Sequence, residues 1–339
     1  MIKTNTQLNN YLEKIKDETL LAIDTEFRRV DSYYPELCLI QIASKGRLEC
    51  FDVLSIDNLE PLFNKLYDNK TKWIVHSARQ DIEALYVLSS RIPSSIFDTQ
   101  IAASFLNYPL QVSYQGLTES IQNVILEKKF TRFDWKIRPL PSDVLQYALD
   151  DVKYLIPIYK KLSIELIKCK KLEWADEECK LLLKKEIYSP NLKQIVKKTK
   201  GISKLSSTHI DKAIKLILWR ESIAMKKNKP RKWIMSDEKL IDYATGIDKL
   251  PINKLNDFQN FAKRNLEKFD YKDLIKIQKP LSENELIKKN ELKKKINALS
   301  NEHNLPSELI CTSKNLVNFL RGSGTVTLNS GWRSKIFKI

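Results

Sequence analysis

Two acidic residues follow directly on an apolar run near the N-terminus. The run Leu20–Ile23 ends at Asp24, and Glu26 comes two residues later. Because side chains alternate along a β-strand, Asp24 and Glu26 would point to the same side of an extended segment. Two carboxylates held so close repel one another, and a divalent cation relieves that repulsion. The pair therefore indicates a metal site, although a strand that ends in solvated acids has the same pattern.

A third acidic residue, Asp81, falls on the apolar face of a predicted helix. The helix is expected over residues 77–88, with Ser77 as its N-cap. Asp81 shares a face with Leu85 and Leu88, which lie one and two helical turns further on, and this face should pack on a sheet. The carboxylate should therefore point inward near the helix N-terminus, where the helix dipole favours an anion. Capping of the helix is the alternative role for Asp81.

A tyrosine and two more acids lie in a third segment, YALDD at residues 147–151, which is also predicted to be helical. Tyr147 and Asp151 are one turn apart, so a phenol and a carboxylate can converge on one point. Asp150 lies close to the same face, and spacing alone does not exclude it from a site.

The elements that must position these residues alternate along the first half of the chain. Strands are predicted at residues 19–27, 37–43, 48–53 and 72–75. Helices are predicted at residues 58–67, 77–88, 98–106 and 117–126, and from residue 142 towards residue 169. Asp98 and Thr99 give a capping signal, and Pro157 should kink or restart the last helix. A three-stranded meander followed by helix–strand units, with helices on both faces, predicts a mixed α/β sheet.

The three acidic segments together resemble the exonuclease motifs of the DEDD superfamily, in the tyrosine branch that includes ribonuclease D. The matching segments are DTE at 24–26, VHSARQD ending at Asp81 and YALDD at 147–151, supported by LIQIA at 39–43, FDTQIAASFL at 97–106 and FDWKIRPLP at 133–141. The resemblance implies a ribonuclease-H-like mixed sheet, with Asp24, Glu26, Asp81 and Asp151 as metal ligands and Tyr147 in the tyrosine position of the family. Asp150 departs from the small residue usual there, and we assign it to the surface.

Such a ligand set fits phosphodiester hydrolysis. Hard oxygen ligands select Mg²⁺ or Mn²⁺ over metals that prefer thiolate or imidazole. Two such ions about 3.5–4 Å apart can hold the attacking and the leaving oxygens of an in-line displacement. Tyr147 would orient the attacking water or assist its deprotonation. His76 is a candidate base, but a packing or capping role beside Ser77 is favoured.

The charge of the chain is distributed unequally. Residues 1–170 contain 22 Lys and Arg and 22 Asp and Glu, so residues 171–339 carry the whole formal charge of +16. This asymmetry favours an acidic partner, with nucleic acid as the leading candidate, whereas a lysine-rich solubilising surface is the alternative.

The segment 215–237 combines a predicted packed helix with a basic turn. The candidate nucleic-acid-binding residues are Arg220, Lys226, Lys227, Lys229, Arg231 and Lys232. Cations near an exposed aromatic side chain suit a nucleic-acid backbone with stacked bases. Trp219 and Trp233 are nevertheless expected to be core residues.

The second half of the chain is predicted to be helical and resembles helicase-and-RNase-D C-terminal (HRDC) domains. WRESIA, the basic turn and SDEKL are similar to a first HRDC domain, and residues 305–322 with SGWR at 330–333 are similar to a second, divergent copy. The predicted division is an exonuclease domain at 1–170, a helical linker at 171–202, a first HRDC domain at 203–281 and a second HRDC-like domain at 282–339, with Lys279-Pro280 between the helical clusters. A fragment of residues 1–170 is expected to fold.

The resemblance implies a 3′–5′ exoribonuclease that trims tRNA precursors and other small structured RNAs with 3′ tails and releases nucleoside 5′-monophosphates. A DNA 3′–5′ exonuclease of repair type is the second hypothesis. An inactive RNA-binding module is the third, and the presence of all four carboxylates and the tyrosine argues against it.

Composition adds expectations about the setting of the protein. No apolar run approaches the roughly 20 residues that cross a bilayer, and the polar N-terminus lacks the apolar core of a secretion signal. We expect a cytoplasmic monomer without membrane partners. Five dispersed cysteines and three histidines do not support a zinc site, and the cysteines are expected to be reduced.

Overall fold

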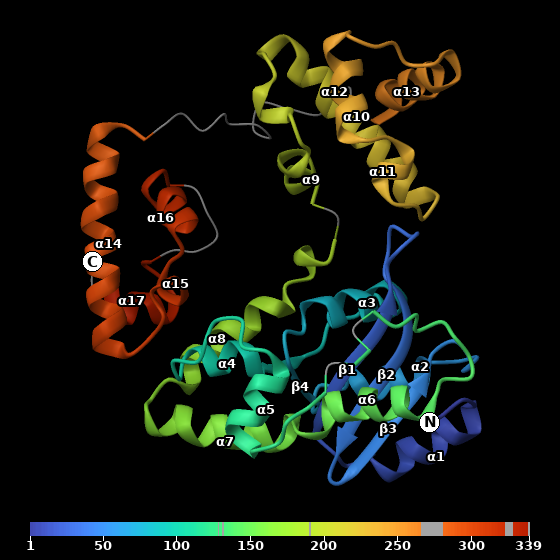
Figure 1. Cartoon of the computed structure of the whole chain (residues 1–339), viewed down its shortest axis with the longest axis vertical. Helices are drawn as coiled ribbons and strands as arrows, with labels where there is room; N and C mark the ends of the chain where they lie inside the picture. The colour runs from blue at the N-terminus through green and yellow to red at the C-terminus, as the bar shows by residue number, and fades with distance from the viewer. Residues whose placement is uncertain (128, 131, 190, 266–280, 323–327, 338–339) are drawn as a thin grey trace. The chain divides into compact units, whose positions relative to one another are not determined.

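The computed structural model describes residues 1–127, 129–130, 132–189, 191–265, 281–322 and 328–337 (Figure 1). The chain forms two compact units. Unit 1 comprises Met1–Arg28, Leu37–Lys184 and Leu281–Ile339, and unit 2 comprises Arg29–Glu36 and Lys185–Pro280. The C-terminal helices therefore belong to the same unit as the exonuclease-like region. The predicted division of the chain had placed residues 282–339 in a separate domain. The assignment of HRDC domains stays a prediction.

A five-stranded mixed sheet forms the centre of unit 1 (Figure 1). Its strands are β1 (Leu20–Arg28), β2 (Glu36–Ser44), β3 (Arg47–Asp52), β4 (Lys72–Val75) and β5 (Ser95–Asp98), in the order β3-β2-β1-β4-β5. β2 and β3 pair antiparallel, whereas β1 and β4, and β4 and β5, pair parallel. The mixed α/β sheet is confirmed. β5 was not predicted, because it is short and its last residue also caps the following helix.

Helices cover both faces of the sheet. The indole nitrogen of Trp73 in β4 donates to the Leu66 carbonyl of α2 at 2.7 Å. The next residue, Ile74, packs with Ile158 and Leu162 of α7. Neighbouring residues of a strand point to opposite faces, so α2 and α7 lie on different sides of the sheet.

The helices of unit 1 include those predicted, in the expected order with shifted ends, whereas α1 was not predicted. They are α1 (Asn5–Lys14), α2 (Glu60–Leu66), α3 (Arg79–Ser89), α4 (Thr99–Ser104), α5 (Tyr114–Gln122), α6 (Ser142–Lys153), α7 (Leu155–Lys168), α8 (Leu172–Lys180), α14 (Glu283–His303), α15 (Ser307–Ile310), α16 (Ser313–Leu320) and α17 (Gly331–Phe337). The helix expected from residue 142 is divided at Tyr154. Pro157 then falls in the first turn of α7, where a backbone N–H has no partner within the helix.

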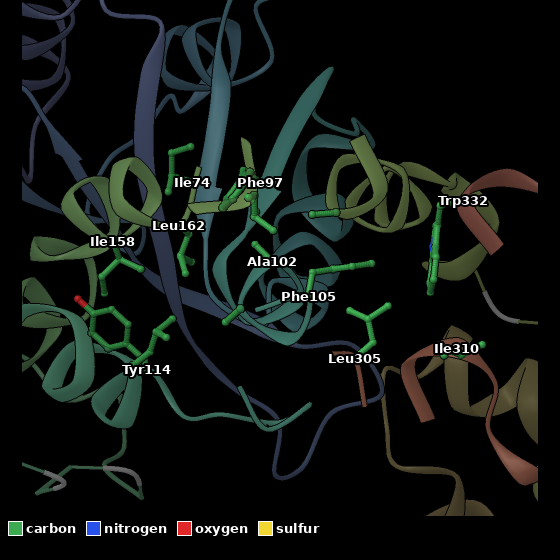
Figure 2. Close-up of a cluster of buried hydrophobic side chains, with 14 of the residues drawn as sticks. Ile74, Phe97, Ala102, Phe105, Tyr114, Ile158, Leu162, Leu305, Ile310 and Trp332 are labelled. Atoms are coloured by element: carbon green, nitrogen blue, oxygen red, sulfur yellow. The ribbon is translucent and has the colours of Figure 1, made fainter. Parts of the chain in front are cut away.

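One hydrophobic core joins the sheet to the C-terminal helices. Figure 2 shows side chains of this cluster from β4, α4 and α7 together with Leu305, Ile310 and Trp332. The Trp332 ring stacks on Trp174 of α8 and meets Phe105 edge-on, with centroid distances of 5.5 and 5.2 Å. Side chains from residues 281–322 and 328–337 therefore complete the core of unit 1, which argues against independent folding of residues 1–170.

Unit 2 has a core of its own, built by helices. These are α9 (Leu192–Lys198), α10 (Ser207–Lys226), α11 (Arg231–Ile234), α12 (Asp237–Thr245) and α13 (Ile252–Asn265). Leu216 and Trp219 of α10 pack there with Leu240 of α12 and Phe258 of α13. The predicted divider Lys279-Pro280 lies outside the described residues.

Two expectations from composition can be compared with the described parts of the chain. No described helix is both long and apolar enough to pass through a membrane. All five cysteines have free thiols, and four of them are buried, whereas Cys169 is exposed.

Candidate active site

Strand β1 and helix α6 bring three carboxylates together. Oxygen atoms of Asp24, Glu26 and Asp151 lie within 4.8 Å of one another. Asp24 and Glu26 share one side of β1, as the alternation predicts. Asp151 stands next to the buried Val152 on α6, which packs against β1. A strand and a helix far apart in sequence thus supply one cluster of oxygen ligands.

Asp81 lies beside this cluster. The Thr25 hydroxyl donates to Asp81 Oδ1 at 2.6 Å, which ties α3 to β1 between the two acids of the strand. Asp81 also lines the same cavity as Asp24 and Glu26. Leu85 is buried as predicted, but Leu88 is half exposed, so the inward face of α3 is shorter than expected.

The turn before α3 is held by Asp98 and not by Ser77. The N-cap is Ala78, with no side-chain cap, and Ser77 has a left-handed backbone with φ of 59°. The Asp98 carboxylate accepts from the backbone N–H of Ser77 at 3.0 Å and of Ala78 at 2.9 Å, and it also caps α4. The prediction of Ser77 as N-cap is wrong, because a carboxylate 20 residues away takes the free N–H groups. Sequence reasoning recognised Asp98 only as the local cap.

The electrostatics of the site favour a positive ion. Burial raises the pKa of Asp24 and Glu26 well above the usual range, and the neighbouring carboxylates raise both further. Burial is also the main cause that raises the pKa of Asp81 to about 6 and that of Asp151 to about 7. Among the described residues, no Lys or Arg pairs with any of these four acids. A bound cation would stabilise their charged forms.

The residues present fit a divalent metal of the hard type. All the candidate ligands are carboxylate oxygens, which suit Mg²⁺ or Mn²⁺. The cavity beside them has a volume of about 430 Å³ and is also lined by Phe27, Phe133 and Trp135. The site therefore offers both ligands and room for a substrate end.

Tyr147 is fixed by aromatic neighbours. Its ring is stacked on Trp135, with 6.5 Å between centroids and 29° between planes, and meets Phe130 edge-on at 5.7 Å. Burial and the nearby Asp151 carboxylate raise the pKa of Tyr147, so the phenol keeps its proton and can donate a hydrogen bond. It stands one turn before Asp151 on α6.

Asp150 and His76 have other partners. Asp150 accepts from Gln146 at 3.0 Å, lies 3.7 Å from the Lys153 ammonium and is not one of the three converging carboxylates. This geometry agrees with its assignment to the surface. Both ring nitrogens of His76 are occupied, by the Thr99 hydroxyl at 2.9 Å and the Val112 carbonyl at 3.0 Å. Burial lowers the pKa of His76, and a packing role fits these contacts.

The predicted basic turn runs from the last residue of α10 into α11 of unit 2. Lys226, Lys227, Lys229 and Lys232 are exposed there. Arg231 is partly exposed and pairs with the buried Glu221 at 2.9 Å. We call residues 226–233 the basic turn.

Two side chains of this segment are placed differently from the prediction. Arg220 is fully buried and donates to the Met235 carbonyl at 3.0 Å and to Asp237 at 2.7 Å, so it is not placed to meet a phosphate. Its spacing of one turn from Leu216 was the available signal. Trp219 is buried as expected, but Trp233 is 63% exposed, with the Lys229 ammonium 5.6 Å from its ring centre. Trp233 therefore joins the exposed surface of the basic turn.

The fold and the acidic site define a 3′–5′ exonuclease. A mixed sheet carries the first two acids on β1, and helices α3 and α6 bring the other two beside them. Residues 1–167 match a protein-family model described as a 3′–5′ exonuclease.

The relatives narrow this class to one family. A ribonuclease D of Bartonella henselae is 32% identical over 99% of this chain and 87% of its own length. A ribonuclease D of Nitrobacter hamburgensis is 29% identical over 99% of this chain and 92% of its own length. The chain belongs to the ribonuclease D family of 3′–5′ exoribonucleases. These full-length matches do not favour the DNA exonuclease hypothesis.

Solved structures agree on the fold. The crystal structure of Escherichia coli RNase D, described as an exoribonuclease involved in structured RNA processing, aligns with a TM-score of 0.83 at 24% identity. The alignment covers 99% of this chain and 95% of that chain. The catalytic core of RRP6 from Trypanosoma brucei aligns with a TM-score of 0.60 at 24% identity, over 77% and 72% of the two chains.

Proposed function

We propose that the chain removes nucleotides from RNA 3′ ends with two divalent ions, Mg²⁺ or Mn²⁺, held by Asp24, Glu26, Asp81 and Asp151. The observation that carries this proposal is the convergence of acids without a paired cation among the described residues. Such a cluster is unfavourable in its charged form unless a metal occupies it.

The protein side chains have distinct parts in the proposed mechanism. When bound, the ions would activate a water molecule and stabilise the departing 3′ oxygen. The protonated Tyr147 hydroxyl donates a hydrogen bond that orients the attacking water. Phe133 and Trp135 form an aromatic wall of the cavity beside the acids.

The substrate class in this proposal is small structured RNA with a 3′ tail, including tRNA precursors, with nucleoside 5′-monophosphates as products. The involvement of the Escherichia coli enzyme in structured RNA processing supports it. The exposed lysines and Trp233 of the basic turn supply cations and a stacking surface for RNA. The proposal also includes a monomeric enzyme that works in the cytoplasm. The free thiols support this location, because the cytoplasm keeps cysteines reduced.

A tRNA with extra 3′ nucleotides tests the proposal. The purified chain is incubated with this RNA and with a DNA oligonucleotide matched to its 3′ tail, in Mg²⁺ or Mn²⁺, and the products are sequenced. We expect shortening of the RNA from its 3′ end, release of monophosphates and loss of activity with EDTA. Preferential degradation of the DNA would favour the repair-type exonuclease, and no cleavage of either would contradict both.

A further inference from the structure

An irregular segment forms one wall of the candidate active site. Residues 132–140, here the aromatic loop, contain no described helix or strand. Phe133 and Trp135 of this loop line the cavity beside the acids, and Trp135 carries the stacked Tyr147 ring. Backbone without regular hydrogen bonds needs other anchors to hold a fixed position.

One side chain, Arg138, provides most of these anchors. Its Nε and Nη2 atoms donate to the two oxygens of Asp52 at 2.8 and 2.7 Å, in a bidentate pair. Nη2 also donates to the Cys38 carbonyl of β2 at 3.1 Å. Nη1 donates to the carbonyls of Trp135 and Ile137, both at 2.8 Å. The guanidinium thus ties the loop to the sheet and to itself.

These bonds leave Arg138 no part in substrate binding. A guanidinium has five N–H groups, and the five bonds described use all of them. A basic residue in a loop of a nuclease site would otherwise be taken as a phosphate ligand.

Asp52, which accepts the bonds of the guanidinium, is itself held in place. It is the last residue of β3 and fully buried, and it also accepts from the Ser55 hydroxyl at 2.9 Å and the Leu54 N–H at 3.2 Å. Burial alone would raise the pKa of Asp52, but the hydrogen bonds from Arg138 and Ser55 outweigh it and lower the pKa. Asp134 gives the loop a further contact, 3.6 Å from Arg28 of β1.

We propose that Arg138 is a positioning residue, which with Asp52 fixes the aromatic loop so that Trp135 holds Tyr147 beside the metal-binding acids. The inference rests on the role proposed for Tyr147. The coupling runs through contacts: Arg138 bonds the Trp135 carbonyl, and the Trp135 ring stacks on Tyr147. Loss of the guanidinium releases the loop and widens the range of Tyr147 positions, while the acids keep their places on β1, α3 and α6.

A double-mutant cycle on the full chain tests this coupling. The values of kcat and KM for RNA are measured for the wild type, Arg138→Gln, Tyr147→Phe and the double variant. Displacement of a catalytic group by about 1 Å can cost about 100-fold, so we expect Arg138→Gln to lower kcat about 10- to 100-fold with little change in KM. In the Tyr147→Phe background the same substitution should lower kcat less than about 2-fold, because the group it positions is already absent. An equal factor in both backgrounds would overturn the inference.

Arg333→Gln is the matched control for general destabilisation. The Arg333 guanidinium also donates hydrogen bonds within unit 1. Its acceptors are the Glu178 carboxylate and the carbonyls of Leu309 and Ile310. It lies among the C-terminal helices, so its loss should lower Tm without changing kcat. A fall in kcat like that of Arg138→Gln would assign both effects to stability alone and contradict the inference.

Further variants keep the test decisive. Arg138→Lys keeps the positive charge but loses the planar guanidinium that donates two bonds to Asp52. This variant should therefore not restore kcat. Full restoration would contradict the bidentate role. Asp52→Asn should reproduce the cycle if Arg138→Gln does not fold. An inactive wild type would contradict the proposed function instead. Hydrogen exchange in residues 132–140 would then still show whether Arg138→Gln releases the loop, and unchanged exchange would overturn the inference.

Discussion

Both units bury charged side chains. Arg220 and Glu221 in unit 2 form ion pairs, whereas the acids of the candidate site in unit 1 lie beside one another. In unit 2, the fully buried Arg220 pairs with Asp237, and Glu221 accepts from Arg231 and from the Tyr33 hydroxyl. In unit 1, the four acids of the candidate site are partly buried, and among the described residues none of them has a cationic partner. Burial of a charge is costly unless it is paired. Paired charges therefore indicate a structural role, and a group of like charges that opens on a cavity indicates a ligand.

Removal of one charge from the acidic group should have the largest effect. Asp24→Asn or Asp151→Asn takes a formal charge from the proposed metal site, so we expect RNA cleavage to fall to background while RNA binding changes little. Gel-based cleavage and binding assays in Mg²⁺ measure both. Asp150→Asn is the control and should stay active, since Asp150 contacts Gln146 and Lys153. Near-native turnover of either site variant would show that the unpaired acids are not ligands.

Tyr147→Phe should have the next largest effect. The ring would still stack on Trp135, but the hydroxyl that orients the attacking water would be missing. General acid–base assistance contributes about 10²–10⁴-fold, so kcat should fall within that range while KM changes little. Single-turnover kinetics on a short RNA separates the two parameters. An unchanged kcat would remove Tyr147 from the mechanism.

The basic turn should contribute less, and to binding alone. Replacing Lys226, Lys227, Lys229 and Lys232 by Gln should weaken RNA affinity and reduce the slope of log K against log salt by about 0.7 for each phosphate that is no longer neutralised. The matched control replaces four exposed lysines of unit 1 by Gln: Lys3, Lys14, Lys70 and Lys160. Both variants give up the same charge. Equal decreases of affinity would show that the basic turn acts only through net charge.

The smallest effect expected is on the stability of the metal-free protein. In the folded chain, the pKa of Asp81 is about 6 and that of Asp151 about 7, whereas an unfolded Asp has a pKa of about 3.9. Between these values the folded state binds more protons than the unfolded state, so these acids reduce stability as pH rises from about 4 to about 7.

Added Mg²⁺ or Mn²⁺ binds the charged acids and offsets this destabilisation. We therefore expect the metal to raise Tm by a few degrees at pH 8 and by less at pH 5. Thermal melts with and without EDTA provide the measurement, and Asp24→Asn with Asp151→Asn should abolish the response. An equal rise in Tm at both pH values would place the metal elsewhere.

The sequence was sufficient for the acidic site because its residues lie within regular strands and helices. Asp24 and Glu26 lie in one strand, and Asp151 shares a helix with Tyr147, so periodicity alone predicted which side chains face the same way. Their convergence followed from the resemblance to known exonuclease motifs, which covers the same three segments.

Contacts between residues far apart in sequence could not be predicted in this way. The bonds from Ser77 and Ala78 to Asp98, and from Arg138 to Asp52 and Cys38, depend on where the turns meet the sheet. The burial of Arg220 and the exposure of Trp233 reversed the expectation from residue type, because an Asp237 partner and a short helix decide their environments.

The shared core of unit 1 has a consequence for the synthesis of the protein. Phe105 and Trp174 pack against Trp332, which the ribosome adds long after both of them. Domains usually fold in order as the chain emerges, but this unit lacks part of its core until translation reaches its last helix. A nascent chain that already carries the acids of the active site would therefore lack part of the core that supports them. A chain that ends before residue 281 provides the check, since it should show no cooperative thermal transition for unit 1.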